Sequence, residues 1–350
     1  MIDQSLDRFD YALARIAIRA QANDQTGAFP ADDLADLTTA GAMAWAVPKQ
    51  FGGDAVDPLE LHLRYERLAV ASLATALVFT QRDSAIGLID AVTDSPLRDE
   101  LLPPLAEGLI YATIGIAQLT TSRHGGLTAT PTNQGYRLDG TIPWSTGAAH
   151  AKYVVAGAEV CDRSGQVLFV LPTDLPNLRI DPPMPLVALW ASWTTSIQCD
   201  GVRIADRLVL RGPVPNALAG RRKGVALSQA FLALGLCQAG LDLMTTHESS
   251  RAAELHSRFS RQLAILRRRV IDLPEPEAAV SGPELRGQVN DLALRITHSA
   301  VALFKGHGLL MDHPAQRLAR EALFLLVWSC PDPVIECTVD ILASARGEPV

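Results

Sequence analysis

Positive charge is the first thing that this sequence has little of. Its 350 residues include 31 Lys and Arg against 38 Asp and Glu, which gives a formal net charge of −7 at pH 7. A protein that coats nucleic-acid phosphates needs a positive field on its surface. The charge balance therefore excludes a nucleic acid as the partner.

Cysteine pairs are also missing. The five cysteines, an odd number, are scattered as Cys161, Cys199, Cys237, Cys330 and Cys337, and none belongs to a Cys-x-x-Cys spacing. Such a set does not provide the ligands of a zinc site or the two thiols of a redox centre. We expect reduced packing residues and no metal site.

Long apolar runs and nucleotide motifs are absent as well. Charged or amide residues interrupt the longest apolar stretches before they reach about 18 residues, so no membrane span is expected. The first ten residues are acidic and amphipathic, where a secretory signal would be basic and then apolar, which predicts a cytoplasmic protein. Neither G-x-G-x-x-G nor G-x-x-x-x-G-K-[ST] occurs, so any nucleotide cofactor is held by another route.

What the chain does have is 48% hydrophobic residues, enough for the cores of two or three domains. Apolar residues recur at helical spacing to about residue 110, short β-branched runs follow as far as Leu210, and helical spacing returns after Gly212-Pro213. The pattern predicts an α+β protein with an N-terminal helical domain (1–110), a middle β-barrel or β-sandwich domain (111–212) and a C-terminal four-helix-type domain (213–350).

Several motifs then occur in an order that points to one family. They are Val47–Gly53, Tyr65–Ala69, Ala117–Ser122, Leu138–Gly147, Thr194–Ile204 and Lys305–Gly308 with Arg320–Ala322. In these residues and their spacing the chain resembles, nearly end to end, the acyl-CoA dehydrogenase family. The resemblance implies an FAD-dependent oxidoreductase with the α, β, α domain order just described.

The resemblance also implies which residues contact the flavin. Leu119 and Thr120 occupy the place of one flavin-contacting strand end, and Trp144, Ser145 and Thr146 occupy the place of another. In the family, the residue at Thr120 bonds the pyrimidine edge, the residue at Thr146 donates towards N5, and the residue at Trp144 packs beside the ring. The alternative is that Trp144 is a core residue and both threonines are ordinary strand residues.

Two glycines near the C-terminus are expected at the other end of the cofactor. By resemblance, Gly306 and Gly308 let the backbone approach the diphosphate of the FAD of a neighbouring subunit, so we expect a homodimer or homotetramer. Glycines that close a helix end are the simpler reading of the same residues.

The chain departs from the family at the general base. Most members carry a glutamate soon after the segment that resembles Arg320–Ala322, and counting forward places Ser329 at that position. In a branch of the family the base lies on the first helix of the C-terminal domain, where this chain has Val225. Asp332 and Glu336 are the nearest carboxylates, and they are weak candidates because nearby carboxylates are usually solvated surface residues.

The substrate implied by the resemblance is an acyl thioester, bound to CoA or to a carrier protein. Gln81 and Arg82 lie on a helix that helps to wall the acyl pocket in the family, and Ser122 and Trp328 complete the expected substrate residues. Polar groups there suggest something other than a plain fatty acyl chain. Alternatively, Gln81 and Arg82 are simply exposed. The electron acceptor is not readable from the sequence.

A second departure affects cofactor binding, because no glycine follows Phe259 in the segment that in the family touches the adenosine diphosphate part of FAD. Three functions therefore stay open. The first is an FAD-dependent oxidoreductase with a non-standard or missing base. The second is a flavin-dependent monooxygenase of the same fold, which requires no α-carbon base. The third is a non-catalytic subunit paired with an active paralogue.

Overall fold

Helices build the N-terminal third of the chain in the computed structural model, which describes residues 4–120, 126–162, 164–219, 225–273 and 275–344. The Asp57 side chain caps α3 ahead of Pro58, and Ser72 caps α4 by accepting from the Thr75 amide. The helices of this domain are α1 (Gln4–Thr26), α2 (Ala31–Thr39), α3 (Pro58–Ala71), α4 (Leu73–Asp90) and α5 (Leu97–Ala106).

The middle of the chain forms a sheet of eight strands within the described residues, in the order β6-β7-β3-β2-β4-β5-β8, with β1 paired to β4. The last strand runs two residues past the boundary expected at 212. Residues 117–120, expected at a strand end, form the short helix α6 after β1. The strands are β1 (Ala112–Gly115), β2 (Leu127–Thr132), β3 (Gly135–Thr146), β4 (Tyr153–Val160), β5 (Gln166–Pro172), β6 (Leu178–Ile180), β7 (Thr194–Ala205) and β8 (Val209–Val214).

Strands β4 and β5 read as continuous apolar runs because both of their faces are buried. Val154 and Phe169 face the interior of the β-domain, whereas Val155 and Leu168 pack in a second core with α4 and α5. Successive side chains of a strand point to opposite faces, so one sheet can serve two cores. This arrangement fixes the β-domain onto the N-terminal helices.

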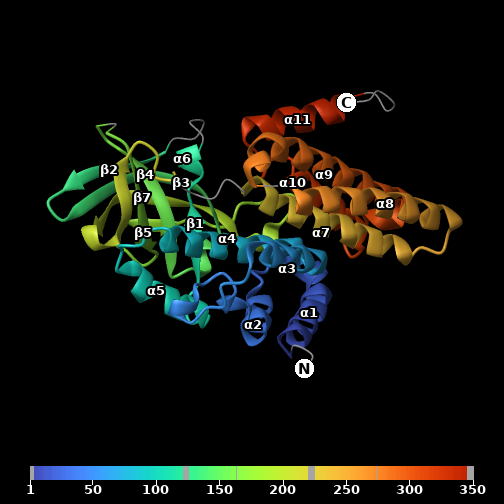
Figure 1. Cartoon of the computed structure of the whole chain (residues 1–350), viewed down its shortest axis with the longest axis horizontal. Helices are drawn as coiled ribbons and strands as arrows, with labels where there is room; N and C mark the ends of the chain where they lie inside the picture. Colours follow the sequence, from blue (N-terminus) through green and yellow to red (C-terminus); the bar gives the residue numbers. More distant parts are fainter. Residues whose placement is uncertain (1–3, 121–125, 163, 220–224, 274, 345–350) are drawn as a thin grey trace.

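The C-terminal domain is a helical bundle. Helix α11 packs on α9 at the outside of the other four, and Figure 1 shows this bundle beside the sheet, with the N-terminal helices beneath both. The predicted fold class, with its N-terminal helical domain, middle β-domain and C-terminal bundle, is confirmed. The helices of this domain are α7 (Val225–Thr245), α8 (Ser250–Asp272), α9 (Glu275–Phe304), α10 (Pro314–Phe324) and α11 (Asp332–Ala343).

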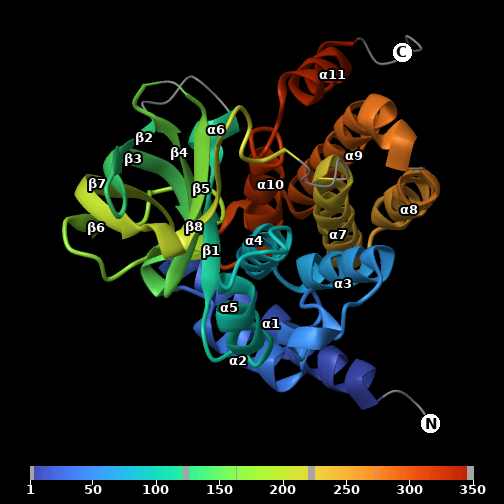
Figure 2. The same cartoon turned by 60° about the vertical axis from the view of Figure 1, so that its left-hand side comes forward.

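Helix α4 is the common neighbour of all three domains. It contacts α3 and α5, strand β1 and helix α7, and Figure 2 shows it between the sheet and the bundle. Its buried residues occur on every side of the helix, which is typical of a helix enclosed by protein. Within the described residues, no helix is both long and apolar enough to span a membrane.

A glycine sets how closely the N-terminal and C-terminal domains approach each other. Helices α3 and α7 pack directly, and a Cβ atom added to Gly235 of α7 would overlap the Glu66 carbonyl oxygen and lie 2.7 Å from the Ala69 Cβ atom. Gly87 of α4 is also helical, but a Cβ atom there would meet nothing within 4 Å.

We therefore expect opposite effects from the same substitution. Gly235→Ala should lower the free energy of unfolding by about 1–3 kcal/mol, because backbone atoms of α3 must move apart to accept the methyl group. Gly87→Ala should raise stability by about 0.5–1 kcal/mol, since alanine loses less conformational entropy in a helix. Urea denaturation of both variants measures this; equal midpoints would contradict the close packing of α3 on α7.

Candidate functional site

The end of strand β3 carries the residues that the sequence placed beside a flavin. The pairing of β3 with β7 shifts between Ile142 and Ser145, which marks a bulge. Trp144 lies within the bulge and is 40% exposed, whereas Ser145 and Thr146, at its end, are buried. Trp144 thus presents its indole at the surface, so it is not an enclosed core residue.

Ser145 and Thr146 use their polar groups differently. The Ser145 hydroxyl donates to the Ile114 carbonyl oxygen at 3.0 Å, which ties β3 to β1. The Thr146 hydroxyl lies 3.1 Å from the Thr194 hydroxyl, and the Thr194 hydroxyl lies 2.8 Å from that of Ser192. Ser145 is therefore a structural residue here, whereas Thr146 ends a row of three hydroxyls. Sequence reasoning missed Ser192 and Thr194, which are near Thr146 only through the pairing of β3 with β7.

Helix α6 lies next to this strand end. Leu119 packs against Gly157 of β4, where an added Cβ atom would overlap the leucine side chain. Gln118 is buried, and its amide nitrogen donates to the Gly115 and Gly157 carbonyl oxygens at 2.9 and 2.7 Å. Its Oε1 atom has no hydrogen-bond partner among the described residues. The side chain of Thr120 and all of Ser122 lie outside the described residues.

The two C-terminal glycines lie in the 3₁₀ turn Lys305–Leu309, which packs on α9 and α10. Gly306 is exposed, and a Cβ atom there would meet nothing within 4 Å. Gly308 is buried, and a Cβ atom there would lie 3.0 Å from the Phe304 Cβ atom. Gly308 therefore serves close packing on α9, while Gly306 leaves open backbone at the surface.

The turn that follows α10 carries Ser329, which the resemblance predicts at the position of the family's glutamate. Ser329 is exposed with φ at +48°, and its carbonyl oxygen accepts from Arg286 at 2.6 Å. Arg286 of α9 also donates to the Trp328 carbonyl oxygen and to Gln229 Oε1, and its Nη2 atom lies 3.5 Å from Cys330 Sγ.

The charge behind this turn is positive. The Arg286 side chain is 1% exposed, and burial lowers the pKa of its guanidinium. No described carboxylate lies within 4.0 Å of it. Burial raises the pKa of the Cys330 thiol, because it disfavours the charged thiolate. Arg286 was not expected at the site, because the polar neighbours Glu284 and Gln288 on the same helix give no sign of an enclosed position.

The other two candidate bases lie on the outside of the bundle. Asp332 begins α11 and Glu336 follows one turn later, and both are exposed. Neither makes a hydrogen bond or ion pair with a described residue. Within the described residues, no three His, Cys, Asp or Glu side chains gather as a metal site would require.

The expected substrate residues divide into three cases. Arg82 is fully buried and donates to Asp83 and to the Met43 and Leu105 carbonyl oxygens, so its expected place in the substrate pocket is corrected to a core ion pair. Gln81, next to it on α4, is half-buried and makes no hydrogen bond to a described residue. Trp328 is half-buried and stacks on Phe324 with ring centroids 5.8 Å apart.

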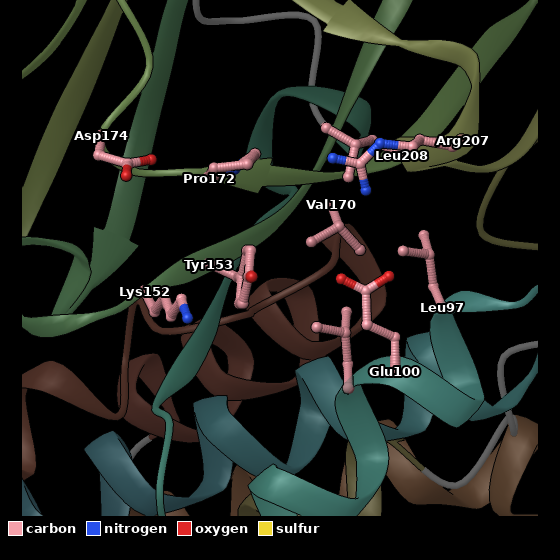
Figure 3. A pocket seen from close by; sticks show the side chains of 10 residues that line it. Leu97, Glu100, Lys152, Tyr153, Val170, Pro172, Asp174, Arg207 and Leu208 are labelled. Carbon is pink, nitrogen blue, oxygen red and sulfur yellow. The ribbon is translucent and has the colours of Figure 1, made fainter.

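One small cavity, of about 100 Å³, lies elsewhere, between α5 and the sheet. Figure 3 shows Glu100 of α5 pointing into it, across from Val170 and Arg207. None of the residues expected at the cofactor or the substrate lines this cavity. A second, open hollow of about 430 Å³ includes Arg8, Trp45 and Arg64 of the N-terminal domain, and it is equally separate from them.

Comparisons with known proteins agree with the motifs and the fold. The family model for the N-terminal domain of acyl-CoA dehydrogenases matches residues 7–109. A probable acyl-CoA dehydrogenase, YngJ of Bacillus subtilis, is 25% identical, and the alignment covers 89% of this chain and 90% of that protein.

Two solved structures share the fold over almost the whole chain. Butyryl-CoA dehydrogenase from Megasphaera elsdenii superposes with a TM-score of 0.83 at 19% identity and 98% coverage of both chains. FMN-bound TdsC from Paenibacillus sp. A11-2, described elsewhere as a dibenzothiophene monooxygenase, superposes with a TM-score of 0.85 at 15% identity and 97% coverage of both. The N-terminal family match, the relatives aligned along most of the chain and the shared architecture together support membership of the acyl-CoA dehydrogenase family.

Proposed function

We propose that this protein is a flavin-dependent oxidoreductase that acts on an acyl thioester. The observation that carries the proposal is the end of β3, where a half-exposed indole stands beside a buried hydroxyl. Trp144 is 40% exposed, whereas Thr146, two residues on, is 8% exposed. The probable acyl-CoA dehydrogenase YngJ and the butyryl-CoA dehydrogenase, which both align with most of the chain, support the same class of reaction.

The residues present at this place suit a flavin ring. The ring is a large, mostly apolar surface with polar atoms that are costly to bury unpaired. Trp144 offers an apolar face, the Thr146 hydroxyl offers a donor, and Gln118 Oε1 is a buried acceptor that lacks a partner among the described residues. When bound, the flavin would accept the hydride that leaves the substrate.

We propose that the flavin is FAD. Gly306 leaves open backbone at a turn of the bundle, which suits the diphosphate of a dinucleotide. In the family this turn approaches the FAD of a neighbouring subunit, so we propose a homodimer or homotetramer in which the bundle of one chain completes the cofactor site of another. We also propose Leu119, Thr120 and Gly308 as cofactor residues, and Gln81, Ser122 and Trp328 as substrate residues, as the family resemblance implies.

The reaction must proceed without the usual carboxylate at the turn after α10. Ser329 has no carboxylate, and the nearest ionised group is the buried Arg286 cation that holds the turn. A serine does not act as a base at neutral pH without a base of its own. Asp332 and Glu336 lie exposed on α11 and stay weak candidates. We propose that the chain binds and orients the thioester while α-proton removal by a side chain of this turn is lost.

A second candidate function follows from the same turn. A flavin-dependent monooxygenase needs no carboxylate to remove an α-proton, and the fold is shared with the monooxygenase TdsC. The third candidate is a non-catalytic subunit that pairs with an active paralogue. The half-exposed Trp144 and the Thr146 hydroxyl speak against the third, because a scaffold has no need of a flavin edge.

The cofactor assignment is tested by the absorption spectrum of the protein after it has been loaded with FAD and desalted. We expect the wild type to retain a visible flavin band, and Trp144→Ala combined with Thr146→Ala to retain much less flavin per chain. Lys49→Ala, on an exposed turn of the N-terminal domain, serves as the control. Unchanged flavin stoichiometry in the double variant would refute the assignment of this strand.

The missing base is tested by restoring it. Under anaerobic conditions, Ser329→Glu should accelerate bleaching of the bound flavin by butyryl-CoA at least about 100-fold, since a positioned general base contributes roughly 100-fold to 10,000-fold. Ser329→Gln has the same size without the charge and should stay as slow as the wild type. A wild type that already bleaches quickly, or equal rates for both variants, would contradict the proposal.

The two enzyme candidates are separated by supplying isotopically labelled O2 to the chemically reduced protein together with the thioester. We expect the product to carry no labelled oxygen. Label in the product, detected by mass spectrometry, would establish the monooxygenase instead.

A further inference from the structure

We propose that Thr194, supported by Ser192, is a positioning residue that turns the Thr146 hydroxyl proton towards the flavin. This inference rests on the proposed function and deepens it. It assigns a role to two residues that lie outside strand β3, in the turn before β7 and at the start of β7.

The three hydroxyls form a buried row. Ser192 is 0%, Thr194 6% and Thr146 8% exposed. The oxygen atoms of Ser192 and Thr194 are 2.8 Å apart, and those of Thr194 and Thr146 are 3.1 Å apart. Because Thr146 and Thr194 are direct partners in the pairing of β3 with β7, the row crosses from one strand to the other.

Counting protons leaves one without an acceptor. Each hydroxyl carries one proton, and the two hydrogen bonds within the row use two of the three. When the row runs in one direction, the remaining proton sits at the Ser192 end or at the Thr146 end; when both neighbours donate to Thr194, it sits on the Thr194 hydroxyl. Neither end has a further hydrogen-bond acceptor among the described residues, and a buried hydroxyl donor left unpaired is costly.

A ligand can supply the missing hydrogen-bond acceptor only at one end of the row. Ser192 is completely enclosed, whereas Thr146 is the last residue of β3 and retains a small exposed area. An acceptor atom beside Thr146, such as the N5 nitrogen of an oxidised flavin, would accept a hydrogen bond from the Thr146 hydroxyl. The row then runs in one direction: Ser192 donates to Thr194, Thr194 donates to Thr146, and Thr146 donates to the ligand.

The backbone around Ser192 holds the start of the row in place. Leu189 and Trp193, on either side of the 3₁₀ turn Trp190–Ser192, both have positive φ, at 58° and 49°. Side-chain-bearing residues rarely adopt this conformation unless the surroundings impose it. The Trp193 indole donates to the Gly27 carbonyl oxygen at 2.7 Å, which anchors the turn to the end of α1.

The neighbouring Thr195 provides a matched control. It lies on the same strand, is 1% exposed, and its hydroxyl donates to the Asp181 carbonyl oxygen at 2.6 Å. It therefore has the same size, burial and hydrogen-bonding capacity as Thr194, but its side chain is directed to the other face of the strand.

The test is the affinity of the full-length protein, stripped of flavin, for FAD and separately for FMN, followed by flavin fluorescence. Thr194→Val should weaken FAD binding about five- to tenfold, the effect of losing about one hydrogen bond. It should also shift the visible spectrum of the bound flavin. Thr194→Ser should restore both, and Thr195→Val should change neither, although it lowers the melting temperature.

In Thr194→Val alone, the buried Ser192 hydroxyl loses its partner, which could destabilise the fold. The double variant Ser192→Ala with Thr194→Val controls for this, because it removes both hydroxyls. It should bind FAD as weakly as Thr194→Val. If the wild type binds FAD or FMN and Thr194→Val binds equally well, the positioning role is overturned while the proposed function stands. If the wild type binds neither, the proposed function fails and this inference fails with it.

Discussion

The antiparallel pairing of β3 with β7 is the interaction on which the rest of the site depends. Two twelve-residue strands lie side by side, and the pairing shifts at a bulge just before Ser145. The bulge turns Trp144 to the surface and leaves Thr146 opposite Thr194. Without this register, the indole and the row of hydroxyls would not meet at one end of the sheet.

A second constraint acts at the turn after α10, which is held by a buried guanidinium. Arg286 donates to the carbonyl oxygens of Trp328 and Ser329, and Asn290, one turn further along α9, donates to Leu325 at 3.1 Å. The turn is therefore held by side-chain hydrogen bonds to its backbone carbonyl oxygens.

Part of the site was accessible from the sequence because it is local. Trp144, Ser145 and Thr146 resemble the family motif in residue type and in spacing, and all three lie on one strand. Position 329 is found by counting forward along a single segment. Ser192, Thr194 and Arg286 were not accessible in this way, because their partners are distant in the chain: Thr194 is 48 residues from Thr146, and Arg286 is 43 residues from Ser329. The enclosure of Arg82 was not accessible for the same reason, since the carbonyl oxygens that accept from it belong to other segments of the chain.

The sequence by itself determined the α, β, α order of the domains, because hydrophobic periodicity changes from helical spacing to short apolar runs and back. It also determined the absence of a carboxylate at position 329. Only the tertiary structure decided which polar groups face one another and which are enclosed. Burial and hydrogen-bond pairing are properties of the packed chain, and the same threonine is an ordinary strand residue or the end of a buried hydroxyl row according to the strand that lies beside it.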